Sequence, residues 1–271
     1  MLDIMLPAFI ECLILVGIHS YLGIHVIKRG VIFVDLALAQ MAAFGTVVAF
    51  IFHYQPDSAM AFIFSLVAAI FGAFIFSILK QKKGEIPLEA GIGVTYAIFS
   101  AATILLIEKA PHGGEHIQEI LTGSLLWVQW KTIITVVVVY SIVGIFHYIF
   151  RDKFIAISED SQKAAEDGIN VRLWDFLFYL SFGVVITLSV RTAGVLLVFV
   201  FLIAPSLFTM MIAKSWKNRL IIGWIMGTLV SLTGLIMSYK LDLPTGPSVV
   251  IVYGGVLLLT SLYKVIISKK G

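Results

Sequence analysis

The chain has 271 residues, of which 60% are hydrophobic and 13% charged, with a net charge of +3 and a mean hydropathy of +1.03. Soluble domains carry about 25% charged residues, so this composition excludes an ordinary water-soluble protein, and the small net charge gives no indication of nucleic-acid binding. Cys12 is the only cysteine, which excludes an intramolecular disulfide and any metal site built on several cysteines.

The hydrophobic runs predict transmembrane helices. The N-terminus, MLDIMLPAF, lacks the basic residues of a signal peptide, so the first run is expected to remain as a helix. A membrane-crossing helix needs about 20 apolar residues, and the runs that approach this length are 5–27, 31–53, 59–79, 88–108, 131–150, 173–190, 194–213, 219–239 and 247–267. A further piece, 117–130, is too short to span alone. We therefore expect an all-α, polytopic transmembrane bundle of about eight or nine spans, forming one domain over residues 1–271.

The distribution of basic residues predicts the topology. Most of them fall in alternate loops: Lys28, Arg29, Lys80, Lys82, Lys83, Arg151, Lys153, Lys163, Arg172, Lys214, Lys217, Arg219, Lys264, Lys269 and Lys270. The remainder, Lys109, Lys131, Arg191 and Lys240, fall on the opposite side. Because cytoplasmic loops carry the excess of lysine and arginine, the N-terminus is expected outside and the C-terminus in the cytoplasm.

Two polar loops are long enough to have a role. Residues 151–172 form the longest polar stretch, on the predicted cytoplasmic side, and residues 159–167 within it are rich in helix formers that end at Gly168. The predicted external loop 109–119 contains His112, Glu115 and His116. Imidazole and carboxylate are ligands that zinc and similar divalent metals prefer. The alternative is that this second loop is simply solvated.

Ionisable and polar residues inside apolar runs are functional candidates, because a charge at mid-membrane costs at least about 2.5–3.5 kcal/mol. They are Glu11, His19 and His25 in the first run, Asp35 and Gln40 in the second, and Glu89 at the start of the fourth. At 100° per residue, Glu11 and His19 lie about 80° apart around a helix and can share a face. Asp35 and Gln40 diverge by about 140° and cannot both point at one ion.

Each of these candidates also has a structural interpretation. Glu11 and His25 would need no function if they lie near the membrane surfaces, where long side chains reach water. His19 would be satisfied by a neighbouring carbonyl group. Asp35 and Glu89 both follow basic residues in the sequence, and either would be an interfacial charge.

No enzymatic motif accompanies these residues. The sequence contains no P-loop, no HExxH and no GxSxG. An active transporter built on this chain would therefore need a separate ATPase. The polar helix expected within residues 151–172 is the type of element that such a partner binds.

Four segments, in order, resemble the permease subunits of bacterial zinc, manganese and iron ABC importers, over nearly the whole chain. They are LGIHVIKRGVIFVDLALAQMAAFG, SEDSQKAAEDGIN, RTAGVLLVFVFLIAPSLFTMMIAKS and YKLDLPTGPSVV. The resemblance implies a multi-pass protein of the bacterial inner membrane, which forms a homodimer and works with a cytoplasmic ABC ATPase and an extracytoplasmic metal-binding protein. The second segment occupies the place of the family's ATPase-docking loop, here with Glu159, Ala164, Gly168 and Asn170.

One departure from the family is specific. In better-known members the second span carries a Gly-Asp pair and, four residues after the aspartate, a histidine, and both of these ligands face the pathway. Aligned from Arg29, those two ligand positions are Leu36 and Gln40 here, and Asp35 stands at the glycine. Glu89 matches an acidic residue that precedes a Gly-Ile motif in the family.

The sequence therefore predicts a non-enzymatic permease subunit that moves zinc, manganese or iron by alternating access, with no permanently bound cofactor. The candidate metal residues are Asp35, Gln40, Glu11, His19, Glu89, His112 and His116. Because Leu36 and Gln40 replace the family's ligands, a permease for a non-metal solute is one alternative. A non-transporting membrane scaffold or an intramembrane enzyme is the other.

Overall fold

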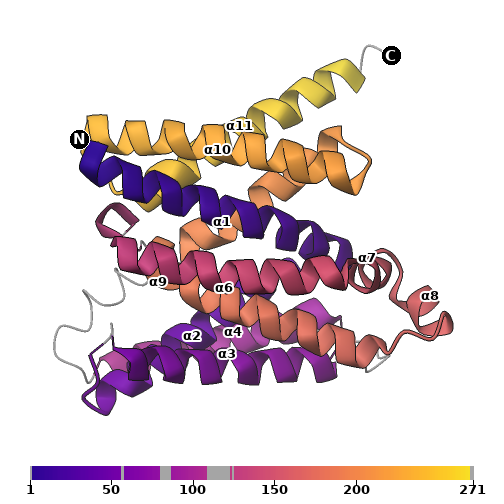
Figure 1. Ribbon diagram of the computed structural model, residues 1–271, viewed down its shortest axis with the longest axis horizontal. Coiled ribbons are helices and arrows are strands. Elements are labelled where there is room, and N and C mark those ends of the chain that lie inside the picture. The colour runs from indigo at the N-terminus through magenta and orange to yellow at the C-terminus, as the bar shows by residue number, and fades with distance from the viewer. Residues whose placement is uncertain (1, 56–57, 80–86, 109–122, 124, 269–271) are drawn as a thin grey trace. The chain divides into compact units, whose positions relative to one another are not determined.

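The computed structural model describes residues 2–55, 58–79, 87–108, 123 and 125–268 (Figure 1). In this part of the chain all regular structure is helical, and no strand is present. The helices are α1 (Leu2–Arg29), α2 (Val34–Ile51), α3 (Ala59–Leu79), α4 (Leu88–Ile107), the 3-10 turn η1 (Leu125–Trp127), α6 (Trp130–Ile149), α7 (Arg151–Glu159), α8 (Ser161–Glu166), α9 (Val171–Ile212), α10 (Trp216–Leu241) and α11 (Thr245–Ser268).

Eight of the described helices are long and apolar enough to cross a membrane: α1, α2, α3, α4, α6, α9, α10 and α11. The prediction of an all-α, multi-pass membrane protein is therefore confirmed. The expected runs 173–190 and 194–213 lie on either side of a break in α9. Gly194 interrupts that helix with φ 76° and ψ 160°, values that no residue adopts within an α-helix.

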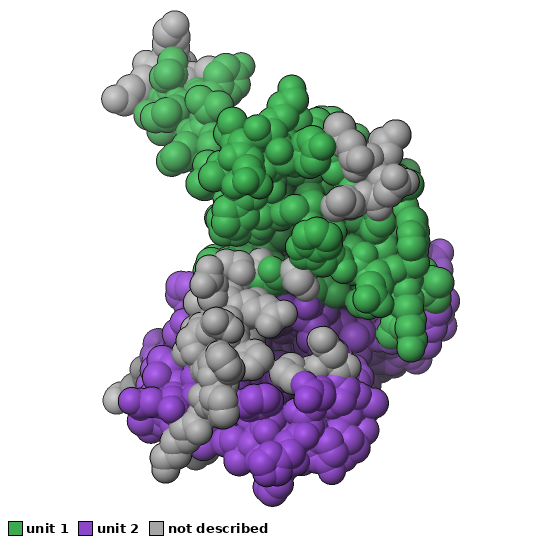
Figure 2. Space-filling view, turned by 90° about the vertical axis from the view of Figure 1, so that its left-hand side faces the viewer, with its two compact units in different colours: residues 1–24, 122–137, 192–271 green, residues 25–121, 138–191 purple. Residues whose placement is uncertain are grey.

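The chain forms two compact units, coloured separately in Figure 2. Unit 1 comprises residues 1–24, 122–137 and 192–271, and unit 2 comprises residues 25–121 and 138–191. Three of the helices, α1, α6 and α9, contribute residues to both units.

Unit 2 contains α2, α3 and α4, which lie side by side (Figure 1). A glycine allows the close approach of α2 to α3, because a Cβ atom at Gly45 would overlap the backbone of Phe64 and Ser65. One residue on, the hydroxyl groups of Thr46 and Ser65 are 2.6 Å apart and form a hydrogen bond. Small residues and hydroxyl pairs of this kind hold helices together where water is absent.

Unit 1 contains most of α1, the second part of α9, and the paired helices α10 and α11. In α1, a Cβ atom at Gly23 would overlap the carbonyl group of Leu202 in α9. The indole N–H of Trp224 in α10 donates to the carbonyl oxygen of Gly17 across 2.9 Å. Helix α1 is thereby fixed against both neighbours through its glycines.

Candidate functional site

The polar segment between α6 and α9 folds into two short helices rather than one. Helix α7 ends at Glu159, and Asp160 starts α8 by accepting hydrogen bonds from the backbone N–H groups of Gln162 and Lys163, both at 3.0 Å. An aspartate at this position is a strong helix start because it satisfies otherwise unpaired N–H groups. The extended backbone of Asp160, with φ −154° and ψ 101°, separates the two helices.

The end of α8 follows the sequence prediction. Gly168 has φ 83°, and its N–H group donates to the carbonyl of Ala165 while that of Ile169 donates to the carbonyl of Ala164. This pair of bonds is a Schellman motif, which requires a residue in the left-handed region and so favours glycine. Asn170 then caps α9 by accepting from the N–H of Leu173 across 3.1 Å.

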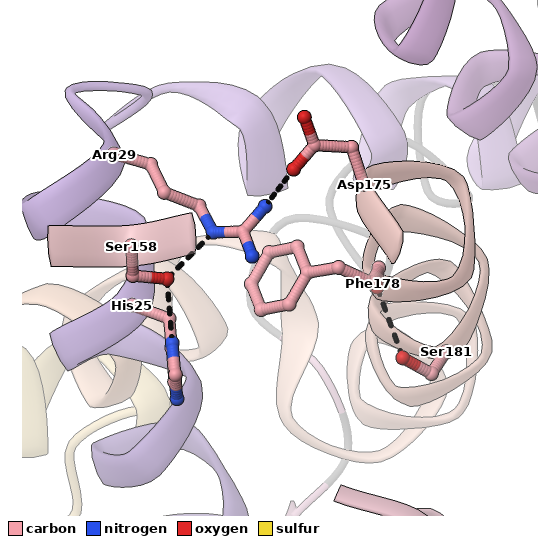
Figure 3. A network of polar contacts seen from close by, with 6 residues as sticks. All are labelled: His25, Arg29, Ser158, Asp175, Phe178 and Ser181. Atoms are coloured by element: carbon pink, nitrogen blue, oxygen red, sulfur yellow. Dashed lines mark hydrogen bonds and ion pairs between the residues drawn. The ribbon is translucent and has the colours of Figure 1, made fainter. Parts of the chain in front are cut away.

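A buried polar network in unit 2 fastens the last turn of α7 to α1 and α9 (Figure 3). The hydroxyl oxygen of Ser158 accepts from Arg29 Nε across 2.8 Å and lies 2.8 Å from His25 Nδ1. Arg29 also forms an ion pair with Asp175, in the second turn of α9, with Nη1 and Oδ1 2.5 Å apart. The Arg29 side chain, in the last turn of α1, thus connects the end of α7 to the start of α9.

Aromatic rings surround this network. The Arg29 guanidinium lies 4.0 Å from the centre of the Phe178 ring, and the imidazole of His147 stacks on Phe154 with the ring centres 4.2 Å apart. His147 also makes a hydrogen bond to Ser181 through Nε2 at 2.8 Å. A charge-assisted bond is stronger in such a low-dielectric setting than in water. The network is therefore a rigid joint and not a loose surface contact.

An exposed ion pair lies at the edge of the joint. Lys28 Nζ and Glu159 Oε2 are 2.7 Å apart, and their side chains are 27% and 44% exposed. Glu159, for which an ATPase contact is predicted, holds the end of α7 to α1 within this chain while its side chain stays partly exposed. Because both groups reach solvent, the pair contributes little to stability.

Asp35 and Glu89 lie together in unit 2, as the first-turn residues of α2 and α4. Asp35 is 1% exposed, and in the described part of the chain no side-chain donor pairs with its carboxylate oxygens, which lie near the backbone N–H groups of Leu36 and of Asp35 itself. Glu89 accepts from the backbone N–H of Phe33 across 3.0 Å through Oε1, whereas no described residue donates to its Oε2. The two carboxylates are close enough to interact electrostatically. A buried acid beside a half-buried one, with few donors between them, is suited to binding a cation.

The other described metal candidates, Gln40, Glu11 and His19, are all buried. Gln40 lies further along α2 and is buried. Glu11 and His19 belong to unit 1, where His19 Nδ1 lies 2.8 Å from the carbonyl oxygen of Leu15, the type of partner expected for a structural histidine. The loop residues His112 and His116 lie outside the described residues. Within the described part of the chain, no group of three His, Cys, Asp or Glu side chains could hold a metal ion.

Three residues of the network were missed by sequence reasoning: Ser158, Asp175 and His147. Asp175 and His147 both fall inside apolar runs that were expected to span the membrane. Ionisable residues in such runs are functional candidates, so the signal was present in the sequence. Nothing local distinguishes Ser158 from other serines of the polar loop.

The helices and the joint define a multi-pass membrane protein in which a short polar helix pair is bound rigidly to the spanning helices. The chain belongs to the ABC 3 transport family, whose model matches residues 1–264. It is therefore a permease component of an ABC transporter.

The similarity of this chain to known proteins covers most of its length. The "Probable iron transport system membrane protein" of Haemophilus influenzae is 25% identical over 248 residues, covering 92% of this chain and 86% of that protein. The "Manganese transport system membrane protein MntC" of Listeria innocua is 27% identical over 242 residues, covering 88% and 82%. The solved structure "PsaBC from Streptococcus pneumoniae in complex with Fab" has a TM-score of 0.80 at 22% identity, covering 95% of this chain and 90% of that one. This last likeness shows a common fold.

Proposed function

We propose that this chain is the permease subunit of an importer that moves zinc, manganese or iron ions across the bacterial inner membrane. The family match and the two relatives whose names refer to iron and manganese transport support this proposal. The observation that carries it is the rigid attachment of α7 to α1 and α9 through Ser158 and Arg29. A permease driven by a separate ATPase needs such an attachment, because force applied outside the membrane must reach the spanning helices.

In this proposal the ATPase binds α8 from the cytoplasm. The exposed residues of α8 are Gln162, Lys163, Ala165 and Glu166, whereas Ala164 is 2% exposed and supports the fold of the segment. Displacement of α8 moves α7, and the contacts of Ser158 transmit that movement to α1 and α9. A packed, hydrogen-bonded joint transmits displacement because it cannot deform continuously.

The buried carboxylates supply the ion pathway. A dehydrated divalent ion in a low-dielectric environment needs compensating negative charge, and Asp35 with Glu89 provides it in unit 2. Gln40 adds a neutral carbonyl oxygen further along α2, in the position where the family has a histidine. Glu11 and His19 are further candidate ligands in unit 1, and the external loop with His112 and His116 receives the ion from an extracytoplasmic binding protein.

The assembly follows from the same proposal. Two copies of the chain form a homodimer with lipid around it, the N-terminus lies outside and the C-terminus lies in the cytoplasm. The cytoplasmic ATPase is a separate subunit, because the sequence has no nucleotide-binding motif.

Transport by the purified complex tests this function. The full chain is co-purified with its ATPase, reconstituted into vesicles and supplied with Mn²⁺, Zn²⁺ or Fe²⁺ together with the binding protein. We expect ATP-dependent accumulation of one or more of these ions and none with a hydrolysis-deficient ATPase. ATP turnover that is stimulated by an organic solute, without accumulation of any metal, would favour the non-metal alternative.

A further inference from the structure

Helix α9 is broken beside a buried acid in unit 1. Gly194 has φ 76° and ψ 160°, so the regular ladder of hydrogen bonds cannot pass through it. Carbonyl groups before such a break and N–H groups after it lose their helical partners. Two residues earlier, the side chain of Thr192 lies next to the carboxylate of Glu11 in α1. The acid is thereby placed at the interruption.

Glu11 is 0% exposed, and among the described residues the Thr192 hydroxyl is the donor that lies beside its carboxylate. A carboxylate that merely capped the second part of α9 would accept from the N–H groups that follow Gly194, and it does not. The adjacent thiol of Cys12 interacts with Ser231 of α10 instead. With the Thr192 hydroxyl alone beside it, the buried acid has fewer donors than the two oxygens of a structural carboxylate usually receive.

The break is also closed by backbone from another segment. Gly123 has φ 66°, and a Cβ atom there would overlap the backbone of Ala193 and Gly194. Only glycine permits this approach. The interruption is therefore lined by backbone of both segments, with no side chain between them.

We propose that Glu11, the Thr192 hydroxyl and the backbone carbonyl groups beside Gly194 form a binding site for a divalent metal ion. All three ligand types are oxygens, which suit manganese and other hard divalent ions better than ions that prefer sulfur or imidazole. The carbonyl end of a helix carries a partial negative charge, and interrupted membrane helices hold cations in this way. This site rests on the proposed import function and narrows its substrate to an oxygen-binding ion such as Mn²⁺.

Direct binding of Mn²⁺ to the purified permease–ATPase complex tests the site without requiring transport. Glu11→Gln keeps the shape of the side chain but removes its charge. Loss of a residue that only supports a metal ligand typically lowers metal affinity by about 10–100-fold. We therefore expect the Mn²⁺ affinity of Glu11→Gln, which loses a ligand itself, to fall at least about tenfold. Thr192→Val should weaken binding less, and Cys12→Ser, next to the site but turned to Ser231, should leave it unchanged. Mn²⁺ should raise the thermal unfolding temperature of the wild type more than that of Glu11→Gln.

Equal Mn²⁺ binding by the wild type and Glu11→Gln, or no binding by a folded wild-type complex, would overturn the site. Metal uptake into vesicles is measured separately, so that the two proposals can fail independently. If metal is taken up but its binding does not depend on Glu11, the proposed site is wrong and the import function stands. If binding depends on Glu11 but no metal is taken up, the site is supported and the import function is wrong.

Discussion

Arg29 and Asp175 form an ion pair in which both side chains are buried, at 0% and 4% exposure, although 146 residues separate them in the sequence. Removal of one member leaves the other charge buried and uncompensated, which typically costs about 3–5 kcal/mol. Arg29→Ala and Asp175→Ala should therefore each lower the free energy of unfolding by this order. Denaturation of the detergent-solubilised chain, followed by intrinsic fluorescence, measures the change.

The control for this prediction is Lys28→Ala. Lys28 is the neighbouring residue, and its ion pair with Glu159 is partly exposed, so its loss should cost at most about 1 kcal/mol. Equal destabilisation by Arg29→Ala and Lys28→Ala would show that burial of the Arg29–Asp175 ion pair does not determine its contribution to stability.

A bulky charge on the exposed face of α8 should disturb partner binding without unfolding the chain. Ala165→Arg places a guanidinium on that face, whereas Ala164 is 2% exposed and Ala164→Arg should disrupt the helix pair itself. We expect Ala165→Arg to retain wild-type thermal stability while it loses co-purification with the ATPase and metal uptake. Normal co-purification and uptake by Ala165→Arg would place the contact elsewhere.

Asp35→Asn should abolish metal uptake without loss of folded protein. The substitution keeps the size and hydrogen-bonding capacity of the side chain but removes the negative charge that we assign to the ion. Because Asp35 is buried near a second carboxylate, that of Glu89, its neutralisation should also leave stability unchanged or increase it. Uptake by reconstituted vesicles and thermal unfolding provide the two measurements.

Glu108→Gln, an exposed change at the other end of α4, is the matched control and should transport normally. If Asp35→Asn also transports at the wild-type rate, Asp35 has a structural role and a non-metal substrate becomes the better interpretation.

Two glycines of α1 should respond oppositely to alanine. A Cβ atom at Gly23 would overlap the carbonyl group of Leu202 and the Ser206 hydroxyl, whereas a Cβ atom at Gly17 would meet nothing within 4 Å. Because backbone cannot move aside as a flexible side chain can, Gly23→Ala should cost about 1–3 kcal/mol. Gly17→Ala should be neutral or gain up to about 1 kcal/mol from helix propensity. Thermal unfolding of both variants in one detergent decides whether this helix contact exists.

The helical part of the fold was predictable because membrane thickness fixes the length of a spanning helix. Each expected span coincides with a helix or, in α9, with one of its two parts. The sequence placed the boundary between those two spans at residues 191–193, and the helix breaks directly after this interval, at Gly194. An interval between two apolar runs thus marked a break that the pattern of either run alone does not show.

The site was predictable only in part. Asp35 and Glu89 were found because a carboxylate beside or within an apolar run is conspicuous, but their proximity depends on how α2 and α4 pack. Arg29 was interpreted as a marker of topology, since a basic residue at the end of a span is normal. Its pairing with Asp175 depends on the tertiary fold, and no local pattern reports a contact over that sequence distance.

The caps of the α8 segment have a thermodynamic consequence for any partner. Asp160 starts α8, Gly168 ends it and Asn170 starts α9, so hydrogen bonds within this short stretch determine its shape. A surface ordered before binding loses little conformational entropy when it binds. Association should therefore show the heat-capacity change of surface burial alone, without the larger change that accompanies folding of a disordered loop.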